Sequence, residues 1–215
     1  MEHNSVDQGA REEILARVRS AVKQAAPRQE SVPVGPLFSP IPDLMARFRQ
    51  ECIDSYVEPI MTADSSATAA ALQQVLASLP EGEIFVQDTP ELRAVAGPAA
   101  QGRAVRWSSE GPPAETSQAT ISRCEALVAL TGSILVSSGG CGGRGASVVA
   151  PCHIVVAHRE QLLPDLEAGL AHARGIAFDN SFLGLITGSS RTGDIEKKLI
   201  IGAHGPRRVV VIVQA

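Results

Sequence analysis

Residues 133–157 read SILVSSGGCGGRGASVVAPCHIVVA. Two apolar runs, 133–137 and 153–157, flank the segment 139–145, in which five of seven residues are glycine. The second run lacks the polar–apolar alternation of a strand with one solvent-exposed face, so we expect it to be buried on both faces of a sheet. Strands of this kind occur mainly in parallel sheets that helices cover, and the stretch therefore predicts an α/β protein.

Strand and helix signals alternate on either side of this stretch. Asp43 is a good N-cap residue, and Leu44, Phe48 and Cys52 or Ile53 would form the inward face of the helix that follows it. The alternation predicts a three-layer α/β fold with a mostly parallel sheet, to which paired strands near 133–157 add an antiparallel portion. Further helices are expected over 65–79, 90–95, 159–173 (with Leu162, Leu163, Leu166 and Leu170 inward) and 194–201, and further strands over 56–61, 84–86, 104–107, 182–187 and 209–213.

The N-terminal segment differs from the rest of the chain. Residues 9–26 are charged and helix-prone, with an apolar stripe of Ile14, Leu15, Val18 and Val22. Pro27 ends this helix, and five prolines between residues 27 and 42 indicate an extended connector. We therefore divide the chain into an N-terminal helical arm with a proline-rich connector, residues 1–42, and a single domain, residues 43–215.

Composition excludes several classes of protein. The chain has 215 residues, of which 44% are hydrophobic and 20% charged, with a net charge of −4 and 3% aromatic residues. A chain without a basic excess and with few aromatic rings is not expected to bind nucleic acid. Neither a signal peptide nor a long apolar run is visible, which predicts a cytoplasmic protein without a membrane span. The four cysteines contain no C-x-x-C pair, so no metal site is expected.

The segment 188–196, GSSRTGDIE, follows a predicted buried strand and opens a predicted helix. Backbone N–H groups at a helix start, with nearby hydroxyls and an arginine, can hold an anion at the carboxyl end of a strand. Acidic residues in the first turn equally favour a well-capped helix that binds nothing, because they satisfy the helix dipole themselves. The sequence leaves both interpretations open. The ligand-binding interpretation uses Gly188, Ser190, Arg191, Thr192, Asp194 and Glu196.

Two other segments are candidate binding elements. Arg144 is the only charged residue in the glycine-rich loop and could reach an anionic ligand if that loop closes. The alternative is a flexible hairpin connection between two strands. Thr131, Gly132 and Ser133 enter a strand and place two hydroxyls around a glycine, which fits either a turn or a binding motif.

Four residues are candidates for acid–base or nucleophilic chemistry. His153 begins a buried strand and is either a general base or a hydrogen-bonded structural residue. His204 lies in a predicted turn and is the second possible base. Glu125 and Asp194 are the carboxylates that could act as nucleophile or base. No catalytic residue can be assigned among these four from the sequence.

Several motifs occur together in one order along the chain. They are SRCEAL (122–127), TGSIL (131–135), the glycine-rich loop with Arg144, PCHI (151–154), TGSSRTGDIE (187–196) and GAHGPR (202–207). In this order and spacing they resemble the LUD-domain family, specifically its lactate utilization protein C branch. The resemblance runs from about residue 43 to the end and is strongest over 120–215.

The resemblance implies a fold like that of the NagB/RpiA/CoA-transferase group, close to the 5-formyltetrahydrofolate cyclo-ligase type. It also implies a role in the oxidation of L-lactate to pyruvate, beside partner proteins that carry iron–sulfur clusters. The cluster-binding cysteine motifs of the longer partner do not occur in this sequence, so we expect no cofactor in this chain. The chain is then a non-redox subunit that binds a small anionic or carboxylate ligand, and whether it is an enzyme by itself stays open.

Two other hypotheses remain. In the first, the chain is a stand-alone enzyme that uses the CoA-transferase-like fold to bind CoA, a sugar phosphate or a carboxylate. In the second, it is a structural or regulatory module that docks through its N-terminal arm.

Overall fold

The structure is a computed structural model, and it describes residues 3–24, 37–193, 199–201 and 205–215. The chain divides into two compact units, residues 1–37 and 38–215. In the first unit, helix α1 spans His3–Gln24 and leaves Ile14, Val18 and Val22 exposed. Among the described residues, no helix has both the length and the apolar character needed to cross a membrane.

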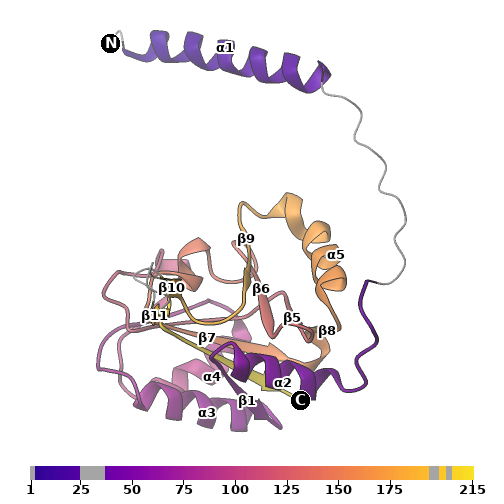
Figure 1. Ribbon diagram of the computed structural model, residues 1–215. Coiled ribbons are helices and arrows are strands. Elements are labelled where there is room, and N and C mark those ends of the chain that lie inside the picture. The colour runs from indigo at the N-terminus through magenta and orange to yellow at the C-terminus, as the bar shows by residue number, and fades with distance from the viewer. Residues whose placement is uncertain (1–2, 25–36, 194–198, 202–204) are drawn as a thin grey trace. The chain divides into compact units, whose positions relative to one another are not determined.

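A six-stranded sheet forms the centre of the second unit (Figure 1). Every neighbouring pair of strands is parallel, so all six carboxyl ends lie at the same edge. In β7 and β12 the residues 154–157 and 209–213 are apolar and buried on both faces of the sheet, as the run 153–157 predicted. In sheet order the strands are β1 (Val57–Thr62), β12 (Arg208–Gln214), β7 (Cys152–His158), β4 (Ala119–Ser122), β2 (Ile84–Val86) and β3 (Val105–Trp107).

Helices α3 (Ser65–Ala77) and α4 (Pro90–Ala99) cover one face of this sheet (Figure 1). Their buried side chains share one core with Ile84, Ile121 and Ile154 of the sheet. The side chains of N-cap residues at both helices accept backbone N–H groups of the first turn, which satisfies donors that the helix itself leaves unpaired.

The other face is covered by helix α2 (Leu44–Asp54) and by a second, four-stranded sheet. Phe48 and Cys52 of α2 are fully buried in this second core, as predicted, whereas Ile53 is exposed. The two faces together give the predicted three-layer fold. In sheet order the second sheet contains β8 (Leu162–Leu163), β5 (Ala126–Val128), β6 (Ser133–Ser137) and β9 (Leu183–Ile186), and helix α5 (Leu166–Ile176) packs on β5.

The antiparallel part of the fold differs from the prediction. Strand β6 is antiparallel to β5 and β9 within the second sheet, whereas β7 belongs to the parallel sheet. The strands 133–137 and 152–158 therefore do not pair, and the glycine-rich loop is not a hairpin connection. It crosses from one sheet to the other and continues into the 3₁₀ turn η2 (Arg144–Ser147), which packs against β4.

The helix predicted over 159–173 is wrong in its first half. Residues Arg159–Gln161 form the 3₁₀ turn η3, and Leu162 and Leu163 pair with β5. Asp165 is the true N-cap, because its side chain accepts the N–H of Ala168 at 2.9 Å. The leucine spacing fits a helix, but the cap decides where the helix begins, and Leu170 is consequently exposed.

The helix predicted over 194–201 is wrong at residues 199–201, the part of it that the structure describes. Leu199–Ile201 form strand β11, which is antiparallel to β10 (Arg191–Gly193) with Arg191 opposite Ile201. The β-branched Ile200 and Ile201 favour a strand. The acidic pair that suggested a helix start, Asp194 and Glu196, lies outside the described residues.

Candidate functional site

The carboxyl ends of β2, β4 and β7 form the edge where polar side chains gather. Strand β2 continues into α4 on one face of the sheet, whereas its neighbour β4 continues into β5 on the other face. Neighbouring parallel strands whose connections leave toward opposite faces open a crevice, and α/β proteins bind their ligands there. We call the side chains that follow these strand ends the carboxyl-edge cluster: Gln87, Glu91, Arg123, Glu125 and His158.

Glu91 joins the charged members of the carboxyl-edge cluster. Its Oε1 atom lies 2.6 Å from Nε2 of His158, and its Oε2 atom lies 2.8 Å from Nη1 of Arg123. Glu91 stands in the first turn of α4, where the helix dipole favours a negative charge. All three side chains are half-buried, so a ligand carboxylate could reach the guanidinium fork of Arg123.

Gln87 links the sheet edge to the glycine-rich loop through two hydrogen bonds of its side chain. Its Oε1 atom accepts the backbone N–H of Arg123 at 2.8 Å, and its Nε2 atom donates to the carbonyl of Gly140 at 2.7 Å. The Gln87 side chain is buried, so both bonds lie away from solvent. One amide side chain therefore fixes the end of β4 and the loop relative to β2.

Glu125, one of the predicted catalytic candidates, lies beside the same loop. Its Oε1 atom accepts a short hydrogen bond from the hydroxyl of Ser137, and the Ser137 oxygen accepts the N–H of Gly140 at 2.8 Å. The loop is thus held by side chains at its first residues. Because the N–H groups of Gly139 and Gly140 are already bonded to the side chains of Asn180 and Ser137, these two groups are not available to a phosphate.

The buried cysteines near the loop are unsuited to nucleophilic chemistry. The Sγ atom of Cys141 accepts the N–H of Ser137 at 3.3 Å. Burial raises the pKa of Cys141 to about 11, and burial raises the pKa of Cys124 still further. Both thiols therefore stay protonated at neutral pH, and the thiolate is the reactive form.

His153, a second catalytic candidate, lies deeper than the carboxyl-edge cluster. Its side chain is fully buried, and its Nε2 atom lies 2.9 Å from Oγ of Ser122 on the neighbouring strand β4. Burial lowers the pKa of His153 to about 4, because the apolar surroundings disfavour the charged imidazolium. The ring is therefore neutral at physiological pH.

The predicted motif of Thr131, Gly132 and Ser133 is placed at the far end of β6. Oγ of Ser133 lies 2.7 Å from Oγ1 of Thr131 and 2.6 Å from Oγ1 of Thr187. Gly132 has a φ of +63°, and a Cβ at this position would come within 2.7 Å of the backbone N of Cys52. The motif therefore brings helix α2 and strand β6 together closely, which is a packing role.

Arg144 is separated from that motif by the length of β6. Its guanidinium contacts Ser181, with Nε 3.2 Å from Oγ and Nη2 3.3 Å from the carbonyl oxygen. The structure thus does not bring Arg144 together with residues 131–133. Gly188 has a φ of +99° and lies close to the carbonyl of Ser55, and the N–H of Ser190 donates to the carbonyl of Pro206 at 2.9 Å. Arg191 and Thr192 lie in β10. The remaining predicted site residues, Asp194, Glu196 and His204, lie outside the described residues.

A second charged group stands next to Gln87 at the ends of β2 and β3. Asp88 pairs with Arg93 at 2.5 Å and accepts the hydroxyl of Ser109, and the Arg93 guanidinium lies 4.3 Å from the centre of the Trp107 ring. The hydrogen bonds from Arg93 and then from Ser109 lower the pKa of Asp88 to about 2. This carboxylate is therefore charged over the whole physiological range.

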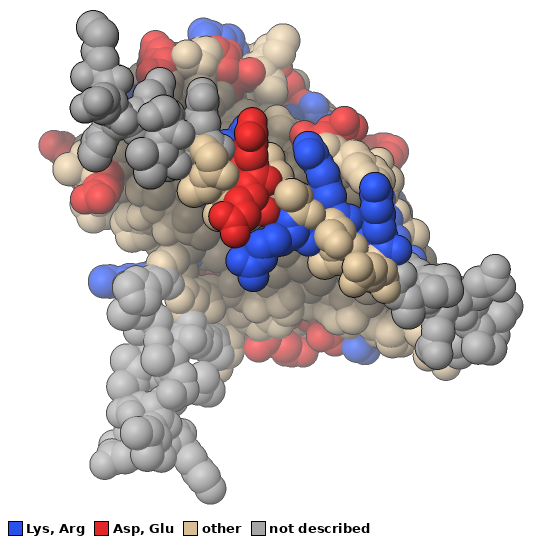
Figure 2. Space-filling view, turned by 90° about the horizontal axis from the view of Figure 1, so that it is seen from above, with Lys and Arg blue, Asp and Glu red and all other residues tan. Residues whose placement is uncertain are grey.

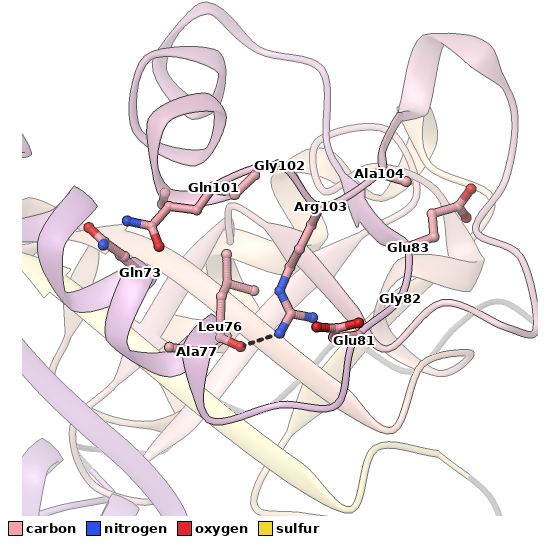
Figure 3. Close-up of a pocket in the computed structure, with 12 residues that line it drawn as sticks. Gln73, Leu76, Ala77, Glu81, Gly82, Glu83, Gln101, Gly102, Arg103 and Ala104 are labelled. Atoms are coloured by element: carbon pink, nitrogen blue, oxygen red, sulfur yellow. Dashed lines mark hydrogen bonds between the residues drawn. The ribbon is translucent and has the colours of Figure 1, made fainter.

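A pocket lies at the opposite edge of the sheet, where β2 and β3 begin (Figure 3). Figure 3 shows Arg103 crossing this pocket toward the end of α3. Its guanidinium donates to the carbonyl of Leu76 at 2.9 Å, the bond drawn in Figure 3. It also donates to the carbonyls of Leu79 and Pro80 at 2.9 and 2.6 Å. Arg103 thus ties the last turn of α3 to the turn that follows it, where it adds donors to carbonyls at and beyond the helix end. Its donors are used structurally, so this pocket is a weaker candidate site than the carboxyl edge.

Charge and metal-ligand patterns add no further site. Acidic and basic side chains lie next to each other on the face seen in Figure 2, rather than in a field of one sign. Within the described ranges, no group of three or more His, Cys, Asp or Glu side chains is arranged to hold a metal ion.

The LUD domain family model matches residues 112–213. The similarity to the LUD domain thus spans a little under half of the 215-residue chain. The matched region contains Arg123, Glu125, His153 and His158, whereas Gln87 and Glu91 precede it.

Three curated relatives of this chain share one name. The chain is 27% identical over 189 residues to lactate utilization protein C of Geobacillus thermodenitrificans, a match that covers 80% of this chain and 78% of the relative. It is 24% identical over 191 residues to lactate utilization protein C of Bacillus subtilis, with the same coverage of 80% and 78%. A shorter match of 30% identity over 100 residues covers 46% of this chain and 47% of lactate utilization protein C of Deinococcus radiodurans.

A solved structure supports the fold of this chain. The crystal structure of a DUF162 family protein from Deinococcus radiodurans superposes with a TM-score of 0.61 and 18% sequence identity, covering 80% of this chain and 96% of that chain. At this identity the likeness shows a shared fold and nothing finer. Neither the predicted kinship to the NagB/RpiA/CoA-transferase group nor the position of a ligand follows from it.

Sequence reasoning misses most of the carboxyl-edge cluster. Gln87 and Arg123 follow strands β2 and β4, Glu91 lies in α4 and His158 ends β7, and of the cluster only Glu125 was a candidate. One available signal is that polar residues follow directly after the buried runs 84–86 and 152–157. Strand β4, which precedes Arg123, gives no comparable signal in the sequence, because it has only four residues.

Proposed function

We propose that this chain is a lactate utilization protein C-like subunit that supports the oxidation of L-lactate to pyruvate in the cytoplasm, together with iron–sulfur partner proteins. The observation that carries the proposal is the match to two proteins named lactate utilization protein C over 80% of this chain. The LUD domain supports the same conclusion.

In this proposal the electron pair of L-lactate passes to clusters that the partner proteins hold. Iron–sulfur clusters need sets of cysteine thiolates. The four cysteines of this chain are buried free thiols without a C-x-x-C pair, a pattern unlike that of a cluster-binding protein. The chain therefore contributes binding and positioning of a small carboxylate and no redox centre of its own.

The carboxyl-edge cluster is the proposed place of carboxylate binding. Arg123 offers a planar fork of donors that matches a carboxylate, and Glu91 and His158 hold that fork at the crevice beside β2. A carboxylate ligand would share or replace the contact that Glu91 makes with Arg123. Arg123→Lys keeps the charge but removes the fork, so it separates geometry from charge.

Growth and complex formation test the proposal together. The growth test does not depend on a binding measurement. The gene is deleted in the native host, and L-lactate or pyruvate is supplied as the sole carbon source. We expect growth on pyruvate but not on L-lactate, and restoration by the wild-type chain. Normal growth of the deletion strain on L-lactate would overturn the proposed function.

Affinity purification of the tagged chain from lactate-grown cells under anaerobic conditions tests the partners. We expect cysteine-rich iron–sulfur proteins to be recovered with the chain. A matched culture grown without lactate shows whether assembly depends on induction of the pathway. Recovery of the chain alone under both conditions would contradict the subunit role.

One observation favours a second candidate function, a stand-alone enzyme of the CoA-transferase-like fold that binds CoA, a sugar phosphate or a carboxylate. Glu125 stands beside the glycine-rich loop at the carboxyl edge and is oriented by Ser137, which is a suitable arrangement for a carboxylate nucleophile or base. Calorimetric titration with coenzyme A and with ribose 5-phosphate tests this function. Saturable binding that weakens in Glu125→Gln would favour it over the subunit role, and absence of binding would remove it.

A further inference from the structure

We propose that Thr120, Ser122 and His153 form a buried subsite that binds the hydroxyl group of a small ligand. Thr120 and Ser122 lie on β4, and His153 lies on β7 directly opposite Thr120 in the parallel register. All three are buried, with Thr120, Ser122 and His153 each 0% exposed. Their side chains lie on the face of the sheet opposite to that of Ile121 and Ile154, which belong to the core under α3 and α4.

The hydrogen bonds fix the protonation pattern of the His153 ring. The Ser122 hydroxyl donates its one hydrogen to the carbonyl of Arg123 at 2.9 Å, because a carbonyl can only accept. The 2.9 Å contact between Ser122 Oγ and His153 must then be a bond that Nε2–H donates. In a neutral imidazole the other nitrogen, Nδ1, is left with a bare lone pair that needs a donor.

Two buried atoms lack partners at this place. Nδ1 of His153 and Oγ1 of Thr120 have no hydrogen-bond partner among the described residues. Leaving a buried polar atom unpaired is costly, and native structures almost always fill such gaps with a polar group, a water or a ligand. Two orphaned atoms on opposed residues of neighbouring strands therefore point to one missing group between them.

The chemistry of the two atoms defines the missing group. Nδ1 can only accept, so the group must donate a hydrogen, and its own oxygen can accept from the Thr120 hydroxyl. An alcohol satisfies both requirements, whereas a carbonyl or carboxylate oxygen would face the Nδ1 lone pair without a hydrogen. The subsite thus favours a hydroxyl-bearing ligand over its oxo or deoxy counterpart. An ordered water is the competing occupant.

The position relates the subsite to the carboxyl-edge cluster. Ser122 is the last residue of β4 and is followed directly by Arg123, the proposed carboxylate-binding residue. A small 2-hydroxy acid carries a hydroxyl next to a carboxylate, so it is the matching ligand class. This choice of ligand rests on the proposed function, whereas the hydroxyl preference rests on the two orphaned atoms alone.

The test combines the tautomer of His153 with a matched ligand series. The full chain labelled with ¹⁵N-histidine gives long-range ¹H–¹⁵N spectra, in which His153 is assigned by the signals lost in His153→Gln. We expect a neutral ring with hydrogen on Nε2. Titration with L-lactate, pyruvate and propionate then compares a hydroxyl, a carbonyl and a methylene at the same carbon. L-Lactate should shift Nδ1 and bind about tenfold or more tightly than the other two, the usual effect of one buried hydrogen bond.

Thr120→Val is the matched variant, because it keeps the shape of the side chain and removes only the hydroxyl. Replacing an unpaired hydroxyl by a methyl group should leave stability unchanged or slightly raised, so the variant is expected to fold. It should lose the preference for L-lactate, whereas Thr120→Ser should retain it. Unfolding of each variant in urea checks that binding differences do not come from misfolding.

Two results would overturn the subsite. One is hydrogen on Nδ1 in the free protein. The other is equal or no binding of the three compounds, which would leave an ordered water as the only occupant. Both are distinguishable from failure of the proposed function, since that is read from growth of the deletion strain on L-lactate.

Discussion

The side-chain amide of Gln87 donates to the carbonyl of Gly140 over 2.7 Å. This bond joins the residue after β2 to a loop that leaves a strand of the other sheet. Through its oxygen the same amide also holds the N–H of Arg123. The geometry of the carboxyl edge therefore depends on one buried side chain in the linker between β2 and α4.

Replacing Gln87 by leucine should destabilise the protein by about 1–3 kcal/mol, because two buried backbone groups lose their partners. The free energy of unfolding in urea measures this, and amide hydrogen exchange should become faster in residues 139–143. Gln50→Leu is the matched control, since Gln50 bonds Asp54 on the exposed surface of α2; it should change stability by no more than about 0.5 kcal/mol. Equal effects of the two variants would contradict the role of Gln87.

The buried His153 should make stability depend on pH. Its pKa is about 4 in the folded protein, against an ordinary value of 6.5. Below pH 6.5 the unfolded chain takes up a proton that the folded chain refuses, so the contribution of His153 is complete above pH 6.5 and is lost as the pH falls toward 4. The loss should reach roughly 3 kcal/mol. Urea unfolding from pH 4.5 to 7.5 measures it.

His153→Gln supplies the control for this pH dependence, because glutamine does not titrate. As the pH falls, the unfolding free energy of the wild type should decrease relative to that of the variant. Curves that run parallel over this range would show that His153 does not titrate as its burial implies.

Gly132→Ala should destabilise the protein strongly. The added Cβ would come within 2.7 Å of the backbone of α2, and the φ of +63° is strained for alanine. We expect a loss of more than about 2 kcal/mol, measured by thermal and urea unfolding. Gly175→Ala is the contrast: its Cβ would meet nothing within 4 Å in helix α5, so it should be neutral or stabilising by up to about 1 kcal/mol. A mild effect of Gly132→Ala would argue against close packing of α2 on β6.

Arg103→Gln should lower the free energy of unfolding by about 1–2 kcal/mol, because the carbonyls of Leu76, Leu79 and Pro80 lose the guanidinium that donates to all three. Arg103→Lys should recover part of the loss, since an ammonium can still bond one or two of them. The exposed Arg49 offers the comparison, and Arg49→Gln should change the urea midpoint little. If the Arg103 and Arg49 variants were equally stable, Arg103 would be free to serve the pocket of Figure 3 instead.

The sequence predictions discussed next are confirmed where the signal is local in the chain, and are wrong where the structure depends on a distant segment. Strands 84–86 and 133–137 were predicted with the bounds that the structure has, because apolar runs between turn residues are local signals. The N-cap at Asp43 is confirmed as well, with its side chain accepting the N–H of Ala46. Leu162 and Leu163 were misassigned, because their spacing fits a helix while their pairing with β5 depends on a distant segment.

The predicted ligand-binding residues form no single site among the described residues. Arg144 and Thr131 lie at opposite ends of β6, although both flank the stretch that indicates the fold. Glycine-rich and hydroxyl-rich motifs draw attention in a sequence, but glycine at position 132 is explained by the approach of α2. A motif of this kind cannot be separated from tight packing without the partner surface.

The sequence by itself determined the α/β class, the mostly parallel sheet and the family resemblance, since each depends on residue order and local apolar patterns. Only the tertiary structure decided which strands are neighbours. By placing β4 between β2 and β7, it brought Glu91, Arg123 and His158 into one cluster and left His153 facing Thr120. Strand order is fixed by the packing of both sheet faces on their covering layers, a non-local free energy that no short stretch of sequence contains.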